Sequence, residues 1–127
     1  MNIFSATTIP IVEQAMNGSM AEQNVLAQNI ANVDTPNYKA KQVAFDDVFN
    51  NALTAEKTNP KHLSFSSDDE AGYRIENDSS GAVQNNGNNV DIDAQMSNLA
   101  KNQLRYQALE QAVSNQFQQF NTVLGGK

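Results

Sequence analysis

The stretch Asn86–Asp93 comes nearest to a cation-binding loop, because it gathers amide and carboxylate oxygens within eight residues. An EF-hand loop with its glycine at Gly87 would need an acidic residue at position 82, which is Ala82 in this chain. The pattern therefore favours a loop that caps a following helix, with Asp91 or Asp93 as the capping residue, over a metal site.

The other candidates for catalysis are one histidine and two acidic clusters. His62 is the only histidine and there is no cysteine, so thiol catalysis is excluded and a transition-metal site lacks ligands. Asp46–Asp47 and Asp68–Glu70 resemble paired acids of a hydrolase, but polar neighbours give no apolar pocket to raise a carboxyl pKa. Neither a nucleophile elbow nor a phosphate-binding glycine loop occurs. We predict no catalytic, cofactor-binding or metal residues, and no enzyme.

Composition indicates a protein that completes its burial against other chains. The net charge is −6 and the eight basic residues are scattered, which argues against a nucleic-acid partner. Asn and Gln together number 30 of 127 residues, which leaves little apolar surface for a large core. No apolar run approaches the roughly 18 residues of a membrane span. No basic residue precedes Lys39, so we expect no cleavable signal peptide.

Two long amphipathic helices are predicted, one near each end of the chain. A 3-4 apolar spacing predicts the first over about Ile9–Asn32, capped by Thr7 or Thr8, with a weak point at Gly18 that favours a brief break or kink near Asn17–Ser19. A 4-3 spacing from Ile92 to Leu124 predicts the second, interrupted by Gln103 and Glu110 and ended by Gly125 and Gly126. The predicted subunit-packing residues on the two stripes are Val12, Met16, Leu26, Ile30, Val33, Met96, Leu99, Tyr106, Val113, Phe117, Phe120 and Leu124.

The segment Asn29–Tyr38 is predicted to end the first helix in a defined turn. Pro36 cannot continue a helix, and Asn37 tolerates the left-handed backbone angles that many turns need. Tyr38 adds an amphipathic anchor. The residues of this turn motif are Asn29, Asn32, Thr35, Pro36, Asn37 and Tyr38.

The segment between the two helices is predicted to be an irregular polar insert. Within it, Phe45–Leu53 has the spacing of a short amphipathic helix, and Leu63–Phe65 could pair with Tyr73–Ile75 as a small β-hairpin. Asn77–Asn89 is predicted to be a solvated loop.

The predicted fold class is mainly α. Residues 1–40 form an N-terminal helical arm with its turn, 41–89 form the insert, and 90–127 form the C-terminal helix. The insert is long enough for the two helices to pack antiparallel as a coiled-coil-like hairpin, so both arms form one helical assembly domain. Each apolar stripe is wider than one partner helix covers, and the surplus argues for assembly with other chains.

Two blocks of the chain resemble the bacterial flagellar rod and hook protein family. Asn29–Ala40 is similar to its N-terminal signature, Ala-Asn-x-x-Thr-Pro-Gly-Tyr, with Asn37 at the position of the usual glycine. Asn88–Asp93, followed by Leu99–Gln107, is similar to the C-terminal part of the short proximal rod members. The resemblance covers both helical arms.

This resemblance implies a structural role in the flagellar basal body. Such proteins are exported uncut through the flagellar type III apparatus and polymerise through their terminal helices into the periplasmic rod, the drive shaft that transmits torque. The implied partners are other copies, other rod proteins, and, at the base, the adaptor protein FliE and the MS ring. The alternatives are a cytosolic helical adaptor or export chaperone that binds a partner helix, and a small hydrolase that uses the clustered acids.

Overall fold

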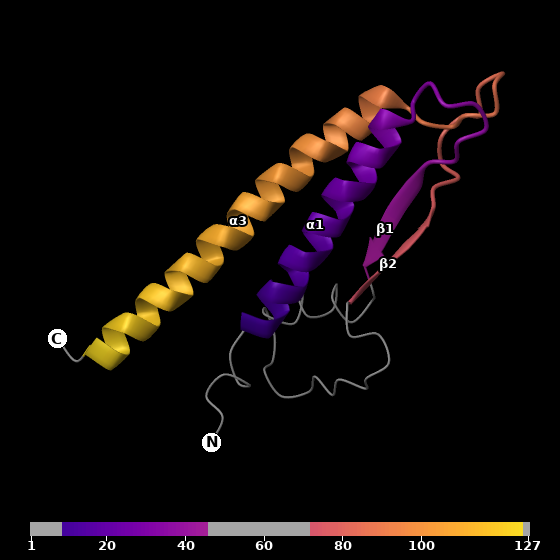
Figure 1. Cartoon of the computed structure of the whole chain (residues 1–127). Coiled ribbons are helices and arrows are strands. Elements are labelled where there is room, and N and C mark those ends of the chain that lie inside the picture. The colour runs from indigo at the N-terminus through magenta and orange to yellow at the C-terminus, as the bar shows by residue number, and fades with distance from the viewer. Residues whose placement is uncertain (1–8, 46–71, 126–127) are drawn as a thin grey trace.

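The computed structural model describes residues 9–45 and 72–125, in which two long helices flank a two-stranded sheet in sequence order (Figure 1). Helix α1 spans Ile9–Ala31, one residue short of the predicted end. Its final turn is closed by the backbone N of Asn32, which donates to the carbonyls of Gln28 at 3.1 Å and Asn29 at 3.2 Å. Such a shared bond is common where a helix ends, and Pro36 soon afterwards prevents continuation.

Helix α3 spans Ile92–Gly125, which confirms the predicted C-terminal helix. The carboxylate Oδ1 of Asp91 accepts hydrogen bonds from the backbone N of Asp93 at 3.0 Å and of Ala94 at 3.2 Å. Asp91 is therefore the N-cap, and Asp93 lies in the first turn, where its charge favours the helix dipole.

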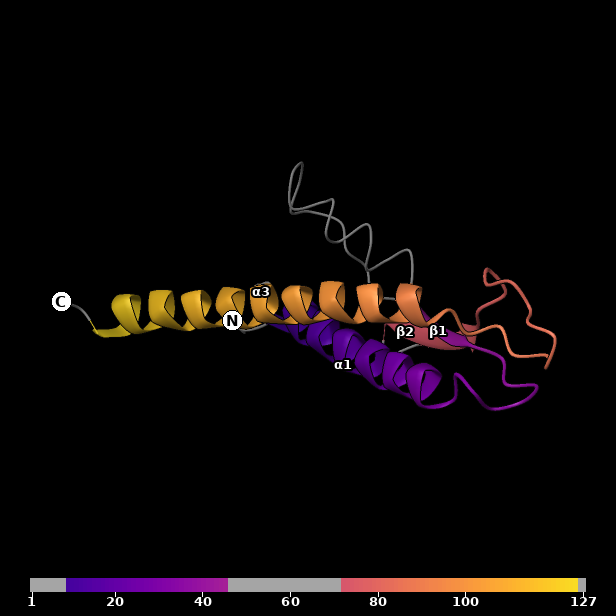
Figure 2. The ribbon, with the colours of Figure 1, turned by 90° about the horizontal axis from the view of Figure 1, so that it is seen from above.

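The two helices run antiparallel, with the start of α3 beside the end of α1 (Figure 1). Helix α3 has 34 residues and α1 has 23, so α3 is longer by eleven residues. The excess lies at the C-terminal end, where α3 extends beyond the first described residue of α1 (Figure 2). We call residues 115–125 the C-terminal overhang; it is about 16 Å long at 1.5 Å per residue.

The two strands form an antiparallel sheet that packs against α1. Strand β1 spans Lys41–Phe45 and β2 spans Tyr73–Asn77, with Phe45 opposite Tyr73. Residues 46–71, between the strands, lie outside the described part of the chain.

A β-hairpin is present in the insert, with a partner strand that was not predicted. Tyr73–Ile75 is in a strand as predicted, and its partner is Lys41–Phe45; Leu63–Phe65, the predicted partner, lies outside the described residues. The helix predicted to start at Phe45 does not start there, because Phe45 ends β1. Alternation of side chains predicts that a segment is a strand, but the partner depends on contacts distant in sequence.

The interior formed by the described residues is small and unusually polar. The buried apolar residues are Ala15, Val25, Leu26, Ala40 and Val90, and the buried polar residues are Ser19, Asn29, Asn88, Asn89, Gln95 and Asn102. Among the described residues, every buried side-chain nitrogen and oxygen has a hydrogen-bond partner. Burying an amide is tolerated only when its hydrogen bonds are replaced, so these polar contacts determine how the elements fit together.

Gly18 is a contact point for the hairpin, and the predicted helix break there is absent. Helix α1 is continuous through Gly18, and a Cβ at this position would overlap Cε1 of the Phe45 ring. The ring therefore lies directly on the backbone of α1, which only glycine permits at this distance. On α3, Arg105 has its guanidinium carbon 5.9 Å from the centroid of the same ring, within the range of a cation–π interaction.

We expect Gly18→Ala to lower the free energy of unfolding by about 1–2 kcal/mol, because displacement of the Phe45 ring outweighs the helix propensity gained. In a Phe45→Ala background the same substitution should raise stability by about 1 kcal/mol, since the obstruction is gone. Urea denaturation followed by helical circular dichroism measures both values. A stabilising Gly18→Ala in the otherwise unchanged chain would contradict this close contact.

Candidate functional site

The junction between α1 and β1 is organised by the side chain of Asn29, which is fully buried. Its Nδ2 donates to the backbone O of Lys41 at 2.7 Å and to Oε1 of Gln95 at 2.9 Å. Its Oδ1 accepts from the backbone N of Lys41 at 2.9 Å and from the hydroxyl of Tyr38 at 3.3 Å. One side-chain amide therefore joins α1, α3, the start of β1 and the end of the turn.

The turn that follows α1 is held by short-range hydrogen bonds. The backbone N of Thr35 donates to the O of Asn32 at 3.0 Å, and the Thr35 hydroxyl donates to Oδ1 of Asn32 at 3.1 Å. The backbone N of Tyr38 then donates to the O of Thr35 at 3.3 Å. Asn37 has a φ of 59°, which confirms that it takes the left-handed conformation.

The loop before α3 closes over this turn through Asn88, whose side chain is fully buried. Its Nδ2 donates to the backbone O of Asn32 and of Thr35, both at 2.8 Å. Its Oδ1 accepts from the backbone N of Val90 at 2.7 Å. Asn88 thus adds a second hydrogen bond to each of these two carbonyls, which already accept from the backbone N of Thr35 and of Tyr38, and so ties the loop to the turn.

Asn89 attaches the same loop to the start of the sheet. Its Oδ1 accepts from the backbone N of Ala40 at 2.6 Å, and its Nδ2 donates to the backbone O of Asp78 at 2.7 Å. The prediction of a solvated loop over Asn77–Asn89 is therefore wrong at its C-terminal end, where Asn88 and Asn89 are buried. Asn88 and Asn89 begin the block that resembles the short rod proteins, but no local pattern predicts that they are buried while Asn85 and Asn86 are exposed, because burial is decided by the turn they contact.

The seam between α1 and α3 also contains reciprocal polar contacts. The Ser19 hydroxyl donates to Oδ1 of Asn102 at 2.7 Å, and Nδ2 of Asn102 donates to the backbone O of Ser19 at 2.8 Å. Beside this pair, Arg105 Nη1 lies 2.8 Å from Glu22 Oε2. Paired polar groups inside a helical seam fix its register, because any shift would leave them buried without partners.

Comparison with known proteins identifies the family to which the chain belongs. The family model described as "Flagella basal body rod protein" matches residues 12–39, which cover most of α1 and the whole turn. The flagellar basal body rod protein FlgB of Bacillus subtilis is 44% identical over 131 residues, covering 100% of both chains. The chain belongs to the FlgB family of flagellar basal-body rod proteins.

Other FlgB proteins are similar over most of their length. FlgB of Borrelia hermsii is 33% identical, covering 98% of this chain and 99% of the relative. FlgB of Escherichia coli is 32% identical, covering 88% of each. As a member of the FlgB family, the chain is a structural subunit of the flagellar rod, and membership implies association with other rod and basal-body components.

The predicted packing residues of this FlgB-family chain divide by exposure. Leu26 is buried, and the half-buried members are Val12, Met16, Ile30, Val33, Leu99, Tyr106, Val113 and Phe120. Met96, Phe117 and Leu124 are exposed. The buried positions of α3 are Gln95 and Asn102. Each lies one residue before a position of the predicted apolar stripe, namely Met96 and the polar interruption Gln103. The face of α3 turned inward within one chain therefore contains only part of the predicted stripe.

The predicted turn residues divide in the same way. Asn29 is buried, whereas Asn32 and Tyr38 are half-buried and Thr35, Pro36 and Asn37 are exposed. Asn29 lies in the last turn of α1 and the other five follow the helix, with Asn29 and Tyr38 meeting through their side chains. The buried members of this junction that the sequence did not predict as site residues are Asn88, Asn89 and Gln95.

The described part of this FlgB-family chain contains no group of three His, Cys, Asp or Glu residues that could hold a metal ion. His62 and the acidic clusters at 46–47 and 68–70 lie outside it. Neither α1 nor α3 has the combination of length and apolar character needed to cross a membrane.

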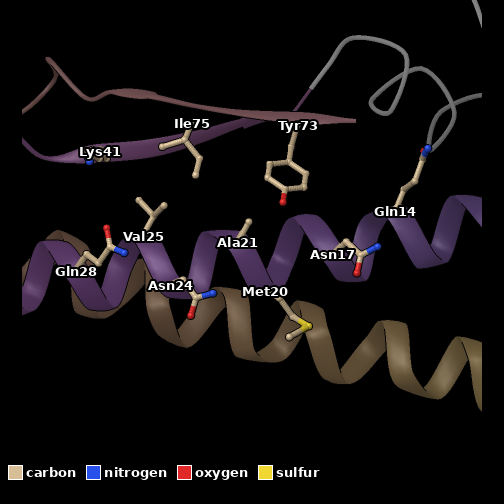
Figure 3. Close-up of a pocket in the computed structure, with 10 residues that line it drawn as sticks. All are labelled: Gln14, Asn17, Met20, Ala21, Asn24, Val25, Gln28, Lys41, Tyr73 and Ile75. Carbon is tan, nitrogen blue, oxygen red and sulfur yellow. The ribbon is translucent and has the colours of Figure 1, made fainter. Parts of the chain in front are cut away.

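A groove of about 550 Å³ lies between α1 and the sheet. Figure 3 shows Tyr73 and Ile75 of β2 directed toward α1, where Ala21 and Val25 face them. The rest of the lining is mostly amide side chains: Gln14, Asn17, Asn24 and Gln28, with Met20 and Lys41. The groove therefore combines apolar side chains with uncharged hydrogen-bonding groups.

Proposed function

We propose that this chain is a structural subunit of the proximal rod that polymerises through its terminal helices into the periplasmic drive shaft. In this proposal residues 1–40 and 90–127 form the helical assembly domain, and residues 41–89 form an insert that leaves it. Torque passes from subunit to subunit by helix packing, and no catalytic step is involved.

The observation that carries the proposal is the apolar surface left on α3 after it has packed against α1. Leu104 is 68% exposed, Phe117 54% and Leu124 83%. In the described part of the chain the interior is largely hydrogen-bonded amide, so the larger apolar side chains of α3 remain available for neighbouring subunits. The proposed packing residues are those of the two predicted stripes, with Met96, Phe117 and Leu124 as the most exposed members.

The proposed partners are other copies of the chain, other rod proteins, and the adaptor FliE with the MS ring at the base. The chain is proposed to reach the periplasmic rod through the flagellar type III export apparatus without a cleavable signal peptide. Membership of the FlgB family supports these assignments.

A deletion strain should lose motility, with assembly stopped at the rod base. Recovery of the protein only from cytosol would instead support the adaptor or chaperone alternative.

We expect Pro36→Ala combined with Asn37→Ala to weaken rod assembly more than secretion. Alanine in the left-handed conformation of Asn37 costs about 1 kcal/mol. Without Pro36 the backbone after α1 is no longer restricted, so the direction in which the chain leaves the helix is less well fixed. The measurements are the amount of subunit in isolated basal bodies and the amount secreted by a strain blocked in assembly.

Asn37→Gly is the matched control for this double variant, because glycine adopts the same φ without strain. It should enter basal bodies at the wild-type level. Unchanged rod yield in the double variant would show that the turn has no special part in assembly.

A further inference from the structure

The C-terminal overhang has the composition of a buried surface. No charged residue occurs from Gln111 to Gly125, whereas the earlier part of α3 carries Asp93, Lys101, Arg105 and Glu110. Within the overhang, Phe117 is 54% exposed, Val123 78% and Leu124 83%. Depletion of charge together with exposed aromatic and aliphatic side chains is typical of the core of a protein interface.

The groove between α1 and β2 matches this composition. Among the described residues that line it, Lys41 is the only charged one. Ile75, 55% exposed, and Tyr73 project into it from β2, and Val25 closes it from α1 (Figure 3). The amide side chains of Asn17, Asn24 and Gln28 on its α1 side can exchange hydrogen bonds with a partner that is itself rich in Asn and Gln.

The overhang and the groove of one chain lie at different places along α1. The groove is lined by α1 residues 14–28, whereas the overhang extends beyond Ile9 (Figure 2). Because the overhang continues the unbroken helix α3, the chain does not fold it back into its own groove. A contact between these two surfaces must therefore join different copies, and it is head-to-tail, the type of interface that propagates into a helical assembly.

We infer that the overhang of one copy docks in the α1–β2 groove of the next, with Phe117 and Leu124 as its anchors. These residues are seven apart and so lie on one face of α3. The inference rests on the proposed function, because it assigns a partner surface within the same polymer. It gives the hairpin a role in assembly beside that of the two helices.

The test uses disulfide cross-linking, for which the cysteine-free sequence gives no background. Two full-length proteins, Ile75→Cys in the groove and Leu124→Cys in the overhang, carry different tags and are expressed together. Isolated basal bodies and the purified mixture are both oxidised and analysed on non-reducing gels. A disulfide requires Cα atoms within about 7 Å, so a mixed dimer reports direct neighbours.

Val83→Cys with Leu124→Cys is the matched control, because Val83 is 64% exposed and lies in the loop before α3. The groove pair should give several-fold more mixed dimer than this control. Equal yields of the two mixed dimers, or a dominant Leu124→Cys homodimer, would overturn the inference. The proposed function would still stand in that case if both variants were present in basal bodies. Absence of all variants and of the unmodified chain from basal bodies would instead refute the proposed function, and the purified mixture would still decide the contact.

Discussion

Replacing Asn29 by alanine is expected to lower the free energy of unfolding by about 3 kcal/mol, the cost of leaving buried hydrogen-bonding groups without partners. The substitution removes both bonds to the Lys41 backbone and the bond to Gln95. It also frees the Tyr38 hydroxyl at the end of the turn. Urea denaturation followed by circular dichroism measures the loss, and the same variant should assemble poorly because α1, α3 and β1 lose their shared contact.

The matched control is Asn24→Ala, which makes the same change in the same helix at an exposed position. Its effect should stay within about 0.5 kcal/mol, as is usual for surface substitutions. If Asn24→Ala and Asn29→Ala destabilised the protein equally, the network around Asn29 would not be what holds the junction.

The second large effect is expected for Asn88→Ala, at about 2–3 kcal/mol. Its side chain bonds the backbone carbonyls of Asn32 and Thr35 and the backbone N of Val90, and alanine replaces none of these. The amide of Val90 should also exchange its hydrogen faster, since it loses its acceptor. Denaturation gives the stability, and hydrogen exchange with residue resolution shows whether the loss begins at the loop.

Asn85→Ala is the control for this prediction, because Asn85 is exposed in the same loop. It should change neither the stability nor the exchange of Val90. Asn88→Asp separates the two halves of the contact, because it keeps an acceptor for Val90 and loses the donor to both carbonyls. If Asn88→Asp were as stable as the wild type, the bonds to Asn32 and Thr35 would contribute little.

Both predictions follow from the use of buried amide side chains to hold the elements of this rod subunit together. Amides fix the arrangement of elements within the chain, as at Asn29, Asn88 and Asn102. Hydrogen bonds of this kind give register and specificity at modest net free energy. The apolar side chains of α3 thereby remain on the surface, where burial between subunits contributes about 25 cal/mol per Å² to assembly.

The sequence by itself determined the two helices and the turn between α1 and the sheet. The spacing of apolar residues placed both helices to within one residue of their observed ends, because periodicity and capping are local properties. An aspartate N-cap, Asp91 or Asp93, and an Asn37 that tolerates left-handed angles were predictable for the same reason. The Thr-Pro-Asn-Tyr turn and its resemblance to flagellar rod proteins needed no structure.

Only the tertiary structure decided which segments that are distant in sequence contact one another. The partner of Tyr73–Ile75 is distant in sequence, and many short polar segments could have paired with it. The burial of Asn88 and Asn89 depended on their reaching the backbone of the turn and of the start of the sheet, which lie far from them in the sequence. Gly18, which looked like a weakness in α1, is where the Phe45 ring lies on the helix backbone. Local rules specify each element, but the contacts between elements depend on geometry that no single segment contains.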